Sequence, residues 1–142
     1  MSWWSFERRW LAVIWQTLLP SGTPGGLALG ARDVPMDRFL DELLACAPRR
    51  VTLGARLCVW LLTFCPLFVI GRPRLFPALA EEERLAVLAK LGQSDVYLVR
   101  ELPTLFKMLG ALGFAGLPAV QAEMGLAVRD SSAPDWAGEP KP

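Results

Sequence analysis

The longest apolar stretch of the chain, which begins at Val51 and ends at Ile70, limits the possible fold more than any other feature. It reads VTLGARLCVWLLTFCPLFVI, and its single charged residue is Arg56. A helix that is apolar on all sides is buried, either in protein or in lipid. The uncharged part, 57–70, would reach about 21 Å as a helix, against about 30 Å of bilayer hydrocarbon. We therefore expect a buried central helix, with a membrane-inserted or interfacial segment as the alternative.

The composition predicts more apolar surface than a small helical protein can bury. Of the 142 residues, 53% are hydrophobic and 20% are charged, so the chain is more apolar than an average soluble domain. The surplus predicts an exposed apolar surface that a partner protein or a membrane would cover. The net charge of +1 gives no electrostatic basis for binding nucleic acid.

The spacing of apolar residues, prolines and glycines predicts an all-α protein. We expect a compact bundle of about five to six helices around the central one. The expected helices cover residues 2–19, 33–47, 51–70, 81–91, a longer segment from 94 onward, and 117–124. Residues 1–127 would form a single helical domain. Residues 128–142 are rich in Ser, Pro, Asp and Gly, which predicts a disordered tail, and Trp136 within it is either a docking residue or has no role.

The longer helix carries a row of leucines that predicts a packing seam. The row alternates steps of four and three residues, as one face of a helix requires. Its members are Leu98, Leu102, Leu105, Leu109 and Leu112. Three glycines, Gly110, Gly113 and Gly116, recur on the same segment. They either allow a neighbouring element to approach closely or mark the end of the helix.

The residues that most enzymes rely on are missing from the sequence. The chain has no histidine, which is the commonest metal ligand and the commonest general base. Cys58 and Cys65 are seven residues apart, about 10.5 Å along a helix and too far for a disulfide. No cysteine pair has zinc spacing, and no dinucleotide or Walker fingerprint is present. We therefore predict that the chain is not an enzyme and has no catalytic, cofactor-binding or metal-binding residues.

The N-terminal segment has one feature of an export signal. Arg8 and Arg9 precede Trp10 and Leu11, an order that resembles a twin-arginine signal. The apolar part that follows is short, and no small-residue cleavage site comes after it. We expect a retained first helix, and the sequence leaves the compartment open.

A series of landmarks over about residues 7–126 resembles one protein family. The first landmarks are Glu7-Arg8-Arg9, Leu18-Leu19-Pro20-Ser21-Gly22 with Pro24-Gly25, Asp33 ahead of Phe39-Leu40, and Arg49-Arg50. The later ones are Gly71-Arg72 with Phe76 and Leu79, Glu82-Glu83-Arg84, the run GFAGLPAV at 113–120, and Met124-Gly125-Leu126. Their order and spacing are similar to those of the small-subunit family typified by gluconate 2-dehydrogenase subunit 3.

The resemblance implies a function for the chain. It implies an α-helical accessory subunit of a large flavin-dependent alcohol or sugar oxidoreductase of the glucose-methanol-choline type, which in some complexes also has a cytochrome subunit. FAD would be bound by the partner, and this chain would carry no cofactor. The small subunit would bind and stabilise the catalytic chain or aid its export.

Tryptophan and arginine dominate the energetics of protein interfaces, and this guides our prediction of the contact residues. We expect the partner interface at Trp3, Trp4, Trp10, Arg72, Arg74 and Phe76. The alternative function is a small membrane-associated helical protein that uses residues 51–70 and the Trp-rich N-terminus, because tryptophan favours the bilayer interface.

Overall fold

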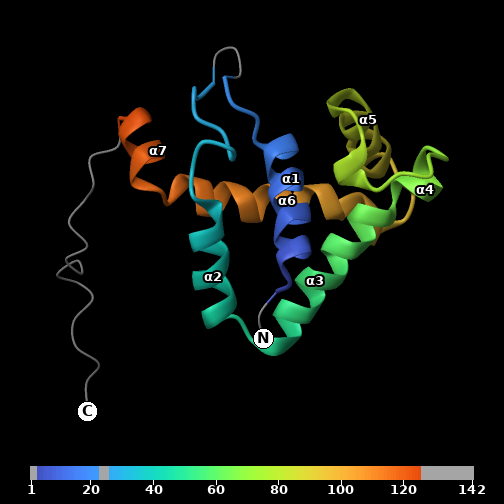
Figure 1. Cartoon of the computed structure of the whole chain (residues 1–142), viewed down its shortest axis with the longest axis horizontal. Helices are drawn as coiled ribbons and strands as arrows, with labels where there is room; N and C mark the ends of the chain where they lie inside the picture. Colours follow the sequence, from blue (N-terminus) through green and yellow to red (C-terminus); the bar gives the residue numbers. More distant parts are fainter. Residues whose placement is uncertain (1–2, 23–25, 126–142) are drawn as a thin grey trace.

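The computed structural model describes residues 3–22 and 26–125, and every regular element in these ranges is a helix (Figure 1). The elements are α1 (Ser5–Leu18), α2 (Met36–Cys46), α3 (Arg49–Phe64), α4 (Pro66–Val69), the short 3₁₀ helix η1 (Phe76–Ala78), α5 (Glu81–Gly92), α6 (Tyr97–Ala115) and α7 (Pro118–Glu123). The all-α prediction is confirmed. The predicted tail, with Trp136, lies outside the described residues.

Helix α1 occupies the middle of the molecule, between α2 and α3, and α6 runs across it (Figure 1). Helix α6 packs on α1, α2 and α5, whereas α1 also contacts α3 and η1. Helices α4 and α5 lie at one end of α6, and α7 lies at the other (Figure 1). One core therefore forms where α1 and α6 cross.

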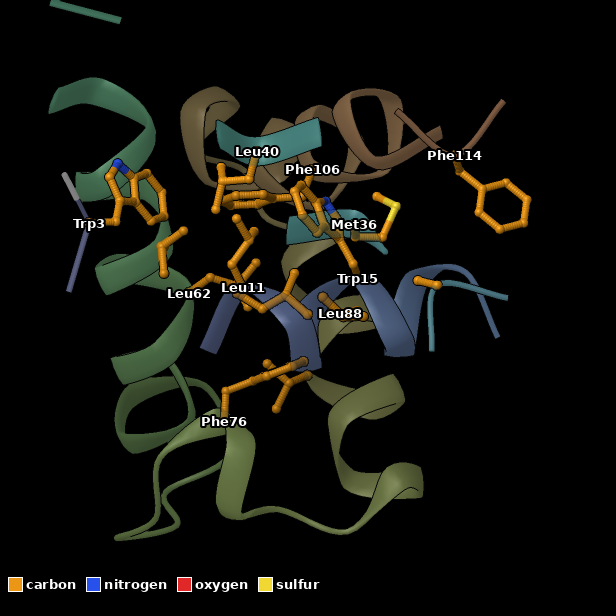
Figure 2. Packing of buried hydrophobic residues seen from close by; sticks show 14 of the residues in the cluster. Trp3, Leu11, Trp15, Met36, Leu40, Leu62, Phe76, Leu88, Phe106 and Phe114 are labelled. Carbon is orange, nitrogen blue, oxygen red and sulfur yellow. The ribbon is translucent and has the colours of Figure 1, made fainter. Parts of the chain in front are cut away.

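The core is built mainly from aliphatic and aromatic side chains of α1 and the elements around it. In α1, Ile14 and Trp15 follow Leu11 by three and four residues, so all three buried side chains point to one side of the helix. They meet side chains of α3, α5, α6 and η1, several of which Figure 2 labels. The buried partners include Val59, Leu62, Phe76, Val87, Leu88, Leu91 and Phe106.

The stretch 51–70 differs from the buried central helix that its composition predicts. It forms two consecutive helices, α3 and α4, because Pro66 has no N–H to continue the helical hydrogen bonds of α3. Only one side of α3 is buried, through Thr52, Val59 and Leu62 among others. The central position belongs instead to α1, and much of the apolar surface of α3 faces outward.

Both glycines within α6, Gly110 and Gly113, lie against aromatic rings from other helices. A Cβ atom on Gly110 would lie 2.7 Å from Cδ1 of Trp15, and one on Gly113 would overlap the ring of Phe39. Gly116 is the C-cap of the helix and has only ordinary contacts. Both predicted roles are therefore present, since Gly110 and Gly113 allow close approach and Gly116 ends the helix.

We predict that Gly110→Ala destabilises the protein by about 1–3 kcal/mol, because the added methyl group would displace the buried Trp15 ring. The free energy of unfolding in urea measures the effect. Gly92→Ala is the matched control, because nothing lies within 4 Å of a Cβ atom at Gly92 in α5. That control should be neutral or stabilising by up to about 1 kcal/mol, and equal losses in both variants would contradict the packing role of Gly110.

Candidate interaction surfaces

A buried carboxylate joins the start of α1 to the middle of α3. Glu7 is completely buried. Its Oε1 accepts hydrogen bonds from Nε of Arg56 at 2.5 Å and Nε1 of Trp60 at 2.7 Å, and its Oε2 accepts one from the backbone N–H of Trp4 at 2.9 Å. We refer to Glu7, Arg56, Trp60 and Trp4 as the Glu7 network. Arg56 and Trp60 are one helical turn apart, so a single side of α3 supplies both donors.

The Glu7 network keeps its carboxylate ionised. Burial is the largest single influence and acts to raise the pKa of Glu7, but the hydrogen bonds from Trp60, Arg56 and Trp4, with the charge of Arg56, together hold the pKa below its ordinary value of 4.5. A buried charge is tolerated only when it is paired and hydrogen-bonded. The network therefore depends on all of its donors being present.

Aromatic rings surround the Glu7 network and continue to the surface. The guanidinium of Arg56 lies 4.2 Å from the centroid of the Trp4 ring. Trp60 also contacts Trp10, with ring centroids 5.4 Å apart, and stacks on Phe64 at 5.7 Å. Trp4 is 56% exposed. The cluster thus presents tryptophan at the edge of α3 while its inner rings support the carboxylate.

The outward side of α3 and α4 forms the first exposed apolar face, which we call the α3–α4 face. It consists of Leu53, Leu57, Leu61 and Phe68, all of which are exposed. Their spacing of four, four and seven residues keeps them on one side of the helix, and Cys65 between the helices retains right-handed helical backbone angles. Phe68 is 87% exposed, an unusual position for a phenylalanine in a protein with a formed core.

A groove opens beside this face, next to an unused hydrogen-bond donor. Trp4, Leu53, Arg56, Leu57 and Trp60 line the groove, whose volume is about 320 Å³. Nη2 of Arg56 is buried and has no hydrogen-bond partner among the described residues. A buried donor of this kind favours an acceptor from outside the chain, because leaving it unpaired is energetically costly.

The charges around the α3–α4 face have one sign in the sequence. No Asp or Glu occurs from Arg49 to Ala80. Arg49 and Arg50 are exposed at the start of α3, and Arg72 and Arg74 are exposed just beyond α4. Glu83 of α5 comes within 3.7 Å of Arg72, between its Oε1 and the arginine Nη2. The face is therefore bounded by arginines at both ends.

The second exposed apolar surface lies on α6, and we call it the α6 face. It consists of Leu98, Leu105, Met108 and Leu112, which are 76%, 55%, 59% and 70% exposed. The predicted leucine seam is thus divided. Leu102 is buried and Leu109 is partly buried, whereas the three leucines at seven-residue spacing face outward. The seven-residue spacing places these three leucines on one side of the helix.

The six residues predicted for a partner interface are not brought together. Trp3 and Phe76 are buried in the core, so we remove them from the predicted interface, because exposing them would break the packing around α1 and η1. Trp10 is half-buried in the aromatic cluster. Trp4, Arg72 and Arg74 are exposed; Trp4 lies against Arg56 in the middle of α3, whereas the two arginines follow α4 in the chain. Leu57, Leu61 and Phe68 are exposed, although the apolar composition of residues 51–70 predicts that they are buried.

All three cysteines are free thiols. Cys46 is exposed, and Cys58 and Cys65 are partly buried. Burial raises the pKa of Cys58, and it raises the pKa of Cys65 to about 12. Within residues 3–22 and 26–125, no group of three or more potential ligands could hold a metal ion. In the same part of the chain, no helix combines the length and apolarity that crossing a bilayer requires.

Comparison with known proteins identifies no relative: no family model, no curated protein and no solved structure matches this chain. The family resemblance of the sequence landmarks therefore stays a prediction. The two exposed apolar faces are the features of the structure from which a function can be proposed.

We predict that Glu7→Gln destabilises the protein by about 3 kcal/mol at pH 7, because Arg56 would be left without its buried counter-ion. Urea unfolding at pH 7 and at about pH 3.5 measures this. The pKa of Glu7 is lowered in the folded chain, so its contribution is complete above the unfolded value and is lost as the pH falls through the folded value. The difference between the two proteins should therefore shrink at the lower pH.

The exposed ion pair between Arg8 and Asp41 provides the control for Glu7→Gln. Asp41→Asn should change the stability little, because solvent screens exposed pairs. A loss for Asp41→Asn as large as that for Glu7→Gln would contradict the central role of the Glu7 network.

Proposed function

We propose that this chain is a non-catalytic accessory subunit that binds a larger protein through its α6 face. The observation that carries the proposal is the exposure of Leu98, Leu105 and Leu112 on one side of a nineteen-residue helix. Large apolar side chains gathered in one exposed row are typical of surfaces that a partner covers. Burying each leucine would contribute about 1.5–3 kcal/mol.

The chemistry around the α6 face suits a helical element of a partner. Leucines seven residues apart repeat every two turns, which is the spacing that packs against a second helix. Glu101 is on the same side of the helix as the leucines, and Lys107 lines a groove beside Met108. This groove of about 490 Å³, lined also by Leu18 and Pro103, could take a side chain of the partner.

The sequence landmarks suggest the class of the partner. Their resemblance to the gluconate 2-dehydrogenase subunit 3 family points to a large flavin-dependent alcohol or sugar dehydrogenase of the glucose-methanol-choline type. In this proposal FAD belongs to the catalytic subunit, a cytochrome subunit belongs to some of the complexes, and the present chain stabilises the catalytic subunit or aids its export. A stable complex of this kind would bury about 800 Å² on each partner.

Co-expression tests the proposal. The chain, with an affinity tag, is produced together with a flavin-dependent dehydrogenase of the glucose-methanol-choline type from the same genome, and the complex is measured by gel filtration and flavin absorbance. We expect Leu105→Glu with Leu112→Glu to abolish co-purification, because two charges would enter the centre of the contact. The dehydrogenase should then also melt at a lower temperature or accumulate less.

Leu85→Glu is the matched control, since Leu85 is an exposed leucine (50%) on α5 and is not one of the residues of the α6 face. It should leave the complex intact. A dehydrogenase that never co-purifies, or one that binds the α6 variants as well as the wild type, would overturn the proposal.

A further inference from the structure

We propose that the α3–α4 face binds the surface of an anionic lipid bilayer, with α3 lying along the membrane. This inference goes beyond the accessory role and uses a different surface from the α6 face. The two proposals can therefore fail independently.

The shape of the α3–α4 face fits the interfacial region of a bilayer. Leu53, Leu57, Leu61 and Phe68 form one row, which at 1.5 Å per residue extends for about 22 Å. The opposite side of α3 is held against the core by Val59 and Leu62, both completely buried. Only the outward row can therefore enter lipid, as in helices that bury one apolar face at the level of the headgroups.

The charges near the row favour anionic lipid. The arginines at both ends, Arg49 and Arg50 before it and Arg72 and Arg74 after it, would lie near the phosphate groups while the apolar row enters the acyl region. Since the net charge of the whole chain is only +1, the attraction must come from this local grouping. Glu83 offsets part of the charge of Arg72.

The groove beside the row is lined by an arginine that, within the described part of the chain, has an unpaired hydrogen-bond donor. Trp4 and Leu57 line it together with Arg56, whose Nη2 has no hydrogen-bond partner among the described residues. A lipid phosphate oxygen could accept that hydrogen bond and pair with the guanidinium. Trp4, which lies over the same guanidinium, has the amphipathic ring that is enriched at bilayer interfaces. An anionic bilayer surface would therefore match all four features, namely the apolar row, the tryptophan, the arginines and the unpaired donor.

Vesicle flotation with the full chain tests the proposal. The probes are vesicles of phosphatidylcholine alone and vesicles of three parts phosphatidylcholine to one part phosphatidylglycerol, at about 0.1 M salt, where charges still interact over about 10 Å. We expect binding to the anionic vesicles, a shift of tryptophan fluorescence to shorter wavelength, and weaker binding as salt is raised. Neutral vesicles should bind at least about tenfold more weakly.

Two pairs of variants locate the contact. Leu61→Ser with Phe68→Ser, and separately Arg72→Glu with Arg74→Glu, should each reduce the partition coefficient by about tenfold or more. Leu105→Ser with Leu112→Ser is the matched apolar control on the α6 face, and Arg38→Glu with Lys107→Glu changes the net charge equally at exposed sites elsewhere. Both controls should bind within about twofold of the wild type. Circular dichroism checks that each variant is folded, and Phe68→Ser alone replaces any double variant that is not.

The proposal is overturned if the wild type does not bind anionic vesicles, or if the control variants lose binding as fully as the α3–α4 variants. Binding to polyglutamate without binding to vesicles would also overturn it, because the face would then fit an acidic protein. Equal binding to neutral and anionic vesicles would refute the role of the arginines.

Discussion

The hydrogen-bonded ion pair between Glu7 and Arg56 is the interaction on which the outer surface of this protein depends. Glu7 lies in the first turn of α1, and its two side-chain donors come from one side of α3. With Arg56 and Trp60 turned toward α1, the rotation of α3 about its own axis is fixed. Leu57 and Leu61 then have to face outward. A buried charge thus determines which apolar residues are exposed.

Two aromatic rings that pack against α6 determine, in the same way, which side of α6 faces the core. Trp15 and Phe39 occupy the space that side chains at Gly110 and Gly113 would fill. The glycine side of α6 must therefore face α1 and α2, and Leu98, Leu105 and Leu112 lie on another side of the helix, where they are exposed. Both exposed apolar faces follow from contacts in the interior, so neither reflects a lack of packing.

The sequence predicted the elements of this fold better than their burial. Turn residues and helix periodicity are local properties, and they identified the all-α class, the helix that begins at residue 81 and the leucine row of α6. The position of residues 51–70 was predicted wrongly, because composition shows that a segment is apolar but not which side of it another helix covers. The partners of Glu7 lie 49 and 53 residues away in sequence, and no local pattern indicates such a pairing. Phe68 could not be identified as a surface residue either, because its exposure depends on which side of α3 and α4 the other helices cover.

The absence of histidine from the chain, together with the chemistry of its buried groups, has a consequence for the environments that the protein can occupy. Without histidine, no side chain of ordinary pKa changes its charge between about pH 5 and 8. The buried ionisable groups reinforce this, since the pKa of Glu7 is lowered and that of Cys65 is raised to about 12, each away from neutrality. The electrostatic character of both faces would therefore be the same in a mildly acidic compartment as in a neutral one. Acidification within this pH range would therefore not cause the release of a bound partner or membrane by changing the charge of this protein.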